Sequence, residues 1–342
     1  MTSRGKTRGS IQRYIDCMQA AQRAHLAVRT EQLDPVAQEW LARECEVLVA
    51  KAGSPEFLAR ASDINALVIR TYTTVDDALL ESLPALKVVA RAGVGVDNVD
   101  LEACLRRGVA VVYTPDANTQ AVVEYVFCLM CDAIRPRIEL QGLVSKNEWD
   151  SIRSTVCGER QLNELTLGIL GLGRIGSRLA RAAGALGMRV IYNDLKTIHP
   201  DLRHGSEEVS LDELLTQADV LSVHIDGRPA NHDFLNATSF DRLKDNAILI
   251  NTSRGFVINE ADLAAWLSQH PRAQAILDVH AKEPFQADSP LLRIENATLM
   301  PHLASRTHTA MANMSWVVKD VLRVLKGEAP KHDAIADLLP KT

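Results

Sequence analysis

The 342-residue sequence lacks any long apolar run. No stretch approaches the roughly 18 consecutive apolar residues that a membrane-spanning helix needs, so we expect no segment to cross a membrane. It also lacks an excess of positive charge. Its formal net charge is −5, whereas a general nucleic-acid-binding protein usually presents a basic surface. These absences argue against an integral membrane protein and against a nucleic-acid-binding protein.

The sequence also lacks a cysteine framework for metals or disulfides. Cys128 and Cys131 form a CxxC, but no second CxxC or CxxH follows nearby. The surrounding "VVEYVFCLMCDAI" is typical of a buried helix, so we interpret both as structural thiols, with a redox or metal role as the alternative. We expect no metal site and, from the cysteine usage, a reducing cytoplasm.

The chain is longer than the roughly 250–300 residues at which one hydrophobic core usually divides, so we expect two domains. Short β-branched runs alternate with helical stretches, a pattern that predicts parallel sheets with helices on both faces. The runs form two series. The first series is 25–30, 46–50, 66–70, 87–91 and 109–114, and the second is 166–173, 189–194, 220–225, 247–252, 275–279 and 297–302.

We therefore predict an α/β protein with two doubly wound parallel-sheet domains. The boundary is expected near "TPDANTQ" (114–120), and the last helix, 307–327, would return to the first domain. This assigns residues 1–116 and 307–342 to one discontinuous domain and residues 117–306 to the other.

Two segments do not fit the alternation. The first 13 residues are basic and contain no acid, which suits either an organellar presequence or, as we favour, a terminus leading into an added helix with an apolar face within residues 11–18. Residues 136–164 show no clear core pattern, and we interpret them as an exposed arm that pairs with a second subunit.

A glycine motif opens the second series. Gly171, Gly173 and Gly176 form GxGxxG directly after the apolar run 167–170 and before a helix. Such glycines allow a tight turn and the close approach of backbone amides to a pyrophosphate, which the helix N-terminus also attracts. The next strand ends at Asp194, 18 residues after Gly176, where a carboxylate would bind a ribose hydroxyl and repel a 2′-phosphate. The motif therefore predicts NAD rather than NADP.

Three reactive side chains follow strands of the same series. Arg254 follows "AILINTS", Glu283 follows "AILDVHAK" and His302 closes "ATLMPH". The carboxyl ends of parallel strands face the ligand crevice. There an arginine can bind a carboxylate or carbonyl oxygen, a histidine can accept a hydroxyl proton, and a carboxylate can stabilise the imidazolium. This set suits oxidation of a 2-hydroxy acid, although each residue alone also fits a purely structural position.

The motifs "GLGRIG…YND", "NTSRG", "DVHAKEP" and "PH" resemble, in the same order, those of the D-isomer-specific 2-hydroxyacid dehydrogenase family, over about residues 60 to 326. The resemblance implies a Rossmann NAD-binding domain, a flavodoxin-like substrate domain, a cleft between them, and usually a homodimer. It implies that Arg254 orients a 2-oxo acid, that His302 is the acid/base and that Glu283 holds His302. It also implies a set of cofactor-binding residues: Gly171, Gly173, Arg174, Ile175, Gly176, Asp194, Thr252, Asp278 and Ser305.

Within the family, the first half is similar to the D-3-phosphoglycerate dehydrogenase branch. This similarity suggests that the amides of Val94 and Gly95 bind the substrate carboxylate, and that Arg70 and Arg91 bind a phosphate or, alternatively, form salt bridges. We therefore expect a small anionic 2-hydroxy or 2-oxo acid as substrate, with 3-phosphoglycerate as the best candidate. The alternatives are a glyoxylate or hydroxypyruvate reductase and, in a different class, an NAD-sensing scaffold like the C-terminal-binding-protein corepressors.

The sequence departs from the family pattern in three places. His280 stands where an aromatic residue, usually Phe, is common, and it is either a packing substitute or an added titrating group. "HIDGRPANHDFL" (224–235) replaces the usual apolar-Pro-Leu-Thr pattern. The chain also ends soon after its last predicted helix, so we expect no regulatory domain.

Overall fold

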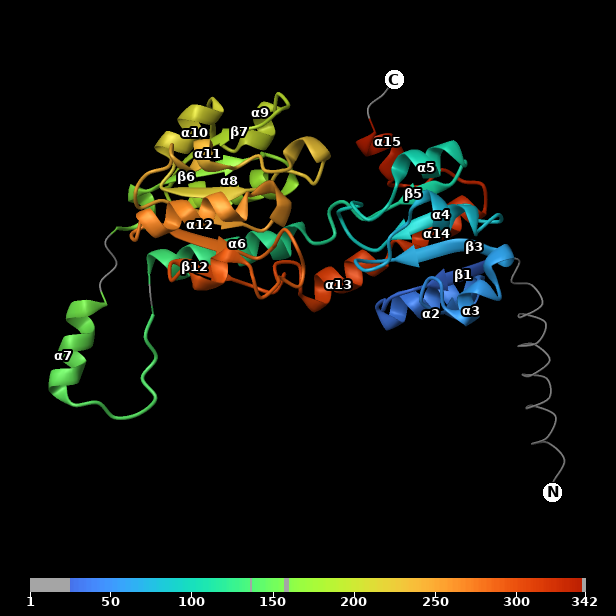
Figure 1. The fold of residues 1–342 in the computed structure, drawn as a ribbon, viewed down its shortest axis with the longest axis horizontal. Helices are drawn as coiled ribbons and strands as arrows, with labels where there is room; N and C mark the ends of the chain where they lie inside the picture. Colours follow the sequence, from blue (N-terminus) through green and yellow to red (C-terminus); the bar gives the residue numbers. More distant parts are fainter. Residues whose placement is uncertain (1–24, 136, 157–159, 340–342) are drawn as a thin grey trace. The chain divides into compact units, whose positions relative to one another are not determined.

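The structure is a computed structural model that describes residues 25–135, 137–156 and 160–339. The chain divides into two compact units, each with its own parallel sheet (Figure 1). Unit 1 consists of residues 1–118 and 307–342, and unit 2 of residues 119–306. The helix that we predicted within residues 11–18 lies outside the described residues.

Unit 1 contains a five-stranded sheet in the order β2-β1-β3-β4-β5, with every neighbouring pair parallel. This is the flavodoxin-like order. The strands are β1 (Leu26–Arg29), β2 (Glu46–Val49), β3 (Ile64–Ile69), β4 (Val88–Arg91) and β5 (Ala110–Val112). The helices are α2 (Pro35–Glu44), α3 (Pro55–Leu58), α4 (Asp77–Glu81), α5 (Leu101–Arg106), α13 (His308–Ser315), α14 (Val318–Leu325) and α15 (Ala334–Leu338).

The central strands of unit 1 are largely apolar because both faces of the sheet are covered. Leu67 and Val89 pack into the cluster on one face, whereas Val68 and Ala90 pack into the cluster on the other. Val321 of α14 belongs to this second cluster, so the C-terminal segment helps to close the core of unit 1.

The prediction of one continuous last helix over residues 307–327 is wrong, because the structure divides it into α13 and α14. α13 ends at Ser315 and α14 begins at Val318, because the backbone hydrogen bonds between them change to a three-residue spacing, as from Asp320 N to Val317 O (2.9 Å).

Unit 2 contains a seven-stranded sheet in the order β12-β11-β10-β9-β6-β7-β8, with every neighbouring pair parallel. This is the Rossmann order with one further strand. The strands are β6 (Thr166–Leu170), β7 (Arg189–Asn193), β8 (Glu207–Glu208), β9 (Val220–Val223), β10 (Ile248–Asn251), β11 (Gln274–Leu277) and β12 (Ala297–Leu299). The helices are α6 (Thr119–Ile134), α7 (Lys146–Thr155), α8 (Arg174–Ala185), α9 (Pro200–Arg203), α10 (Leu211–Gln217), α11 (Ala237–Phe240) and α12 (Glu260–Gln269).

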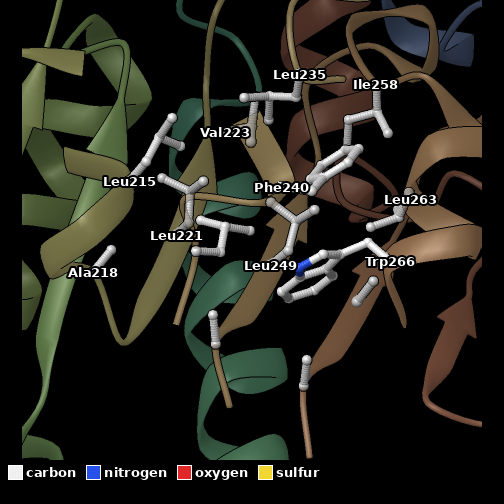
Figure 2. Close-up of a cluster of buried hydrophobic side chains, with 14 of the residues drawn as sticks. Leu215, Ala218, Leu221, Val223, Leu235, Phe240, Leu249, Ile258, Leu263 and Trp266 are labelled. Carbon is white, nitrogen blue, oxygen red and sulfur yellow. The ribbon is translucent and has the colours of Figure 1, made fainter. Parts of the chain in front are cut away.

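The sheet of unit 2 is also buried on both faces. Figure 2 shows one face, where Leu221 and Leu249 of the strands meet Phe240 of α11 and Trp266 of α12. On the other face, Ile250 packs with residues of α6 and α8. The predicted fold class, two doubly wound parallel-sheet domains of the Rossmann and flavodoxin-like kinds, is confirmed. Within the described residues, no helix is both long enough and apolar enough to cross a bilayer.

Two helices of unit 2 differ in burial. Half of the residues of α6 are buried, but Cys128 is exposed and Cys131 is half-buried, so the expectation that this helix buries both cysteines is wrong for Cys128. Their role as structural thiols stays a prediction. Cys128 lies on the side of α6 away from the buried face that includes Val122, Val126 and Leu129. α7 has no buried residue. A helix that buries none of its side chains is not held by a core of its own.

Candidate active site

The three predicted catalytic residues follow three neighbouring strands of unit 2. Arg254 follows β10, Glu283 follows β11 and His302 follows β12. Because these strands are parallel and adjacent, the three residues leave the sheet at the same edge, the edge where ligands bind in open α/β sheets.

His302 and Glu283 are in direct contact. Nδ1 of His302 lies 2.7 Å from Oε2 of Glu283, and Oε1 of Glu283 accepts a hydrogen bond from the backbone N–H of His280 (3.1 Å). Partial burial works to raise the pKa of Glu283, but the hydrogen bond from His302 and the charge of its ring outweigh it, so this pKa lies below its ordinary value. Glu283 is therefore ionised at neutral pH beside the imidazole.

A third carboxylate fixes the backbone that carries His302. The Asp278 side chain is fully buried, and its two oxygens accept hydrogen bonds from the N–H groups of Leu303 (2.7 Å) and Ala304 (2.8 Å). His302 itself has a φ of 56°, which few non-glycine residues adopt. The two bonds from Asp278 hold the turn in which this conformation occurs.

Burial raises the pKa of Asp278 above its ordinary value despite those two hydrogen bonds. Tyr125 of α6 interacts with the same carboxylate. Burial, and then the charge of Asp278 and a hydrogen bond to it, raise the pKa of Tyr125 to about 12. Sequence reasoning missed Tyr125, because nothing in the helical pattern of α6 points to a residue more than 150 positions further along the chain. For Asp278, contact with the cofactor stays a prediction, since the structure shows its carboxylate bonded to backbone.

Arg254 is linked to the same loops through its neighbour Gly255. A Cβ atom on Gly255 would lie 1.8 Å from the carbonyl carbon of His280 and 2.4 Å from N of Ala281, so the two loops touch through backbone atoms. The carbonyl of Arg254 accepts a hydrogen bond from Nδ2 of Asn251 (2.9 Å). The Arg254 side chain donates from Nη1 to the carbonyl of Ser253 (2.8 Å). The loop of Arg254 is thus packed on the loop that leads to Glu283.

His280, one of the departures from the family pattern, is 7% exposed. Its Nε2 lies 2.8 Å from the carbonyl oxygen of Met300, and its ring meets the edge of Phe285 with centroids 4.9 Å apart. These contacts tie the loop after β11 to the loop after β12, as a packing residue would.

The glycine loop after β6 has the shape that a dinucleotide needs. Gly171 has a φ of 95°, and a Cβ there would lie 2.9 Å from the carbonyl oxygen of His224. A Cβ on Gly176 would lie 2.3 Å from the carbonyl oxygen of Gly171, so this glycine allows α8 to pack closely on the loop. A Cβ on Gly173 would meet only open space, and Gly173 caps α8 without a side chain, which leaves room for a phosphate at the helix N-terminus.

The other predicted cofactor residues surround this loop or the neighbouring strand ends. Asp194 accepts hydrogen bonds from the N–H groups of Leu172 (2.7 Å) and Lys196 (2.8 Å). Arg174 and Ile175 form the first turn of α8. Thr252 is buried, and its hydroxyl has no hydrogen-bond partner among the described residues. These features fit a bound dinucleotide, whose polar groups would satisfy such atoms. Ser305 is half-buried three residues after His302.

The predicted substrate residues belong to unit 1. The guanidinium of Arg91 lies against Gly93, because Nη1 would be 1.3 Å from a Cβ at that position. Arg91 is therefore held at the turn that contains Val94 and Gly95. Arg70 donates from Nη1 to the carbonyl of Gln32 (3.4 Å), and its Nη2 lies 3.0 Å from the sulfur of Met311.

A glycine loop on a Rossmann sheet, with an imidazole–carboxylate pair at the carboxyl edge of the same sheet, defines a nicotinamide-dependent dehydrogenase. Residues 127–304 match the model of the D-isomer-specific 2-hydroxyacid dehydrogenase NAD-binding domain. The chain belongs to this family of NAD-dependent oxidoreductases, and the resemblance seen in the sequence is confirmed.

Three known proteins are similar to this chain. The chain is 33% identical over 282 residues to a D-3-phosphoglycerate dehydrogenase of Archaeoglobus fulgidus, covering 82% of this chain but only 53% of that protein. It is 35% identical over 292 residues to a glyoxylate reductase of Thermococcus litoralis, covering 82% of this chain and 87% of that protein. The crystal structure of a glyoxylate reductase from Paecilomyes thermophila is similar with a TM-score of 0.78 and 27% identity, over 92% of this chain and 99% of that one. The chain thus spans about half the length of the first relative and most of the other two.

Proposed function

We propose that this protein oxidises a D-2-hydroxy acid, or reduces the corresponding 2-oxo acid, with His302 as the proton-transfer residue. The observation that carries the proposal is the 2.7 Å contact between His302 Nδ1 and Glu283 Oε2. When Nδ1–H donates to Glu283, the lone pair of Nε2 is left to accept the proton of the substrate's 2-hydroxyl group. Glu283 stabilises the imidazolium that then forms. NAD, when bound at the glycine loop, would accept or return the hydride of the α-carbon.

The remaining site residues would bind and orient the substrate. Arg254 would pair with the carboxylate and polarise the 2-oxo group through its forked donors. Its position next to Gly255, which contacts the loop leading to Glu283, supports this role. The amides of Val94 and Gly95 would bind the carboxylate from unit 1.

For the substrate we propose 3-phosphoglycerate. Arg70 follows β3 and Arg91 ends β4, and these neighbouring strands of unit 1 could present both cations to a phosphate. The phosphoglycerate dehydrogenase relative supports this choice. A glyoxylate or hydroxypyruvate reductase is the second candidate. It is favoured by the match to most of the Thermococcus enzyme and by the contacts that Arg70 already makes with Gln32 and Met311.

The test is a screen of NADH formation from 3-phosphoglycerate, D-glycerate, D-lactate and glycolate, repeated on Arg70→Ala and His302→Ala. We expect His302→Ala to lose at least about 10²-fold in kcat while it still binds NADH. Arg70→Ala should lose about 10-fold or more in kcat/KM with 3-phosphoglycerate only, because an arginine–phosphate pair is lost. Turnover of unphosphorylated acids alone would refute the phosphate assignment. NADH binding without any rate that depends on His302 would instead indicate a sensing scaffold.

We also propose that the protein is a homodimer that acts in the cytoplasm. Exposed apolar side chains occur along residues 137–156, including Ile138, Leu143 and Trp149, and α7 buries none of its own residues. A second copy would cover them. The four described cysteines are free thiols, which suits a reducing compartment.

A further inference from the structure

The segment that replaces the family's apolar-Pro-Leu-Thr pattern, residues 224–235, begins against the glycine loop. A Cβ on Gly171 would lie 2.9 Å from the carbonyl oxygen of His224 and 3.1 Å from Cγ2 of Ile225. On the other side of the same loop, Leu172 donates its N–H to Asp194. In the sheet, β6 lies between β9 and β7, so the loop after β6 is flanked by the loops that carry Asp226 and Asp194.

Asp226 and Arg228 form a tight ion pair in this segment. Nε of Arg228 donates to Oδ1 of Asp226 (2.7 Å), Nη2 of Arg228 donates to Oδ2, and the backbone N–H of Arg228 also reaches Oδ1 (3.3 Å). Asn231 also holds Asp226 in place, since its Nδ2 donates to the carbonyl oxygen (2.9 Å) and to Oδ1 (3.1 Å) of Asp226. Asn231 is 5% exposed, so the loop is anchored in the core.

The loop with this pair and the loop with Asp194, the predicted ribose-binding acid, lie on the two sides of the glycine loop. Hydrogen bonds to Asp226, and to a smaller extent the charges of Asp226 and Asp194, raise the pKa of Arg228. The hydrogen bond from Arg228, together with the charges of Arg228 and Lys196, holds the pKa of Asp226 below its ordinary value. Two carboxylates and two cations therefore gather near the position where the adenosine ribose of a dinucleotide would lie.

We infer that Asp226 is a second determinant of dinucleotide selectivity, which acts by adding a carboxylate beside Asp194 and by holding Arg228 away from a 2′-phosphate. A guanidinium near this ribose is the group with which dehydrogenases accept NADP. Arg228 has that chemistry, but the side of its guanidinium formed by Nε and Nη2 is bonded to Asp226. A 2′-phosphate would therefore meet two negative charges and an arginine that Asp226 holds by its Nε and Nη2 donors.

The inference rests on the proposed binding of NAD at the glycine loop, and its test is a binding measurement. NADH and NADPH are titrated by their own fluorescence against the wild-type chain, Asp226→Asn, and the double variant Asp226→Asn/Arg228→Gln. Asp233→Asn is the matched control, because Asp233 lies in the following loop and pairs with His232. Its φ of 51° is one that asparagine accepts.

We expect the wild-type chain to bind NADH more tightly than NADPH. Asp226→Asn should tighten NADPH binding by about 10-fold and leave NADH binding within about 3-fold, because the released guanidinium gains a charge-assisted pair. The double variant should lose this gain, and Asp233→Asn should show none.

Three results would overturn the inference alone: equal wild-type affinities for the two dinucleotides, no selective gain in Asp226→Asn, or a gain that persists without Arg228. A wild-type chain that binds neither dinucleotide would overturn the proposed function as well. Thermal unfolding of each variant shows whether the fold is intact.

Discussion

At the scale of single residues, the pKa values of two carboxyl groups near His302 are shifted in opposite directions by their surroundings. The pKa of Glu283 is lowered, because its contact with His302 outweighs partial burial, and the pKa of Asp278 is raised by burial. The group with the lowered pKa is therefore the one suited to stay charged beside an imidazolium. It contributes stability above its unfolded-state pKa, and this contribution is lost as the pH falls through its folded-state pKa.

The variant Glu283→Gln tests whether the charge of Glu283 stabilises the imidazolium of His302. The amide keeps an acceptor for His280 but removes the charge that stabilises a protonated imidazole, so we expect the acidic limb of the kcat/KM profile for oxidation to move to lower pH. We also expect kcat to fall by about 10-fold or more, since charged hydrogen-bond partners contribute more than neutral ones. An unchanged profile across pH 5–9 would mean that Glu283 does not act through His302. Glu295→Gln, an exposed site in the same unit, is the control.

At the scale of elements, the important contact is between the loops that follow β11 and β12. Asp278 begins the first loop and accepts the amides of the second, and Tyr125 reaches the same carboxylate from α6. Since the pKa of Tyr125 is raised to about 12, its hydroxyl stays protonated at working pH. Three elements thus meet at one buried carboxylate.

Asp278→Asn distinguishes positioning from cofactor binding. The variant replaces one acceptor oxygen with a donor that faces a backbone N–H, so the turn of His302 loses one of its two bonds. We expect kcat to fall at least about 10-fold while the dissociation constant of NADH, followed by its fluorescence, changes less than about 3-fold. A large loss of NADH affinity with normal kcat would instead support the role in cofactor binding that the resemblance suggested. Asp288→Asn, an exposed change in the same region, controls for the loss of charge.

The sequence was sufficient for most elements but not for these contacts. Apolar runs predicted the strands well because both sheets are buried on both faces, and only β8, which consists of Glu207 and Glu208, escaped notice. The glycine motif was readable because two of its glycines have local causes: Gly171 has a positive φ, and Gly176 packs against the carbonyl of Gly171. The bonds of Asp278, by contrast, join residues 25 and 26 positions apart, and no local pattern encodes them. Likewise, the sequence shows Gly255 but not the peptide bond that it touches.

At the scale of the whole molecule, several large apolar side chains of residues 137–156 are exposed within the described chain. Leu143 is fully exposed and Trp149 is 47% exposed. Leu143→Asp should therefore convert the proposed dimer to a monomer, because a charge would be buried in the shared surface. Light scattering coupled to size-exclusion chromatography measures the mass.

Leu105→Asp, an equally drastic change at an exposed position of α5, should leave the mass unchanged. A wild-type mass near 37.6 kDa, that of one chain, would contradict the dimer, as would a Leu143→Asp variant that still elutes as the wild type does.

The bare α-carbon at position 255 sets the spacing between the residue proposed to capture the anion and the pair proposed to move the proton. Any added side chain would have to displace the peptide of His280 and Ala281, and that displacement would travel three residues further to Glu283. We therefore expect Gly255→Ala, which adds a single methyl group, to abolish activity although every reactive side chain is still present.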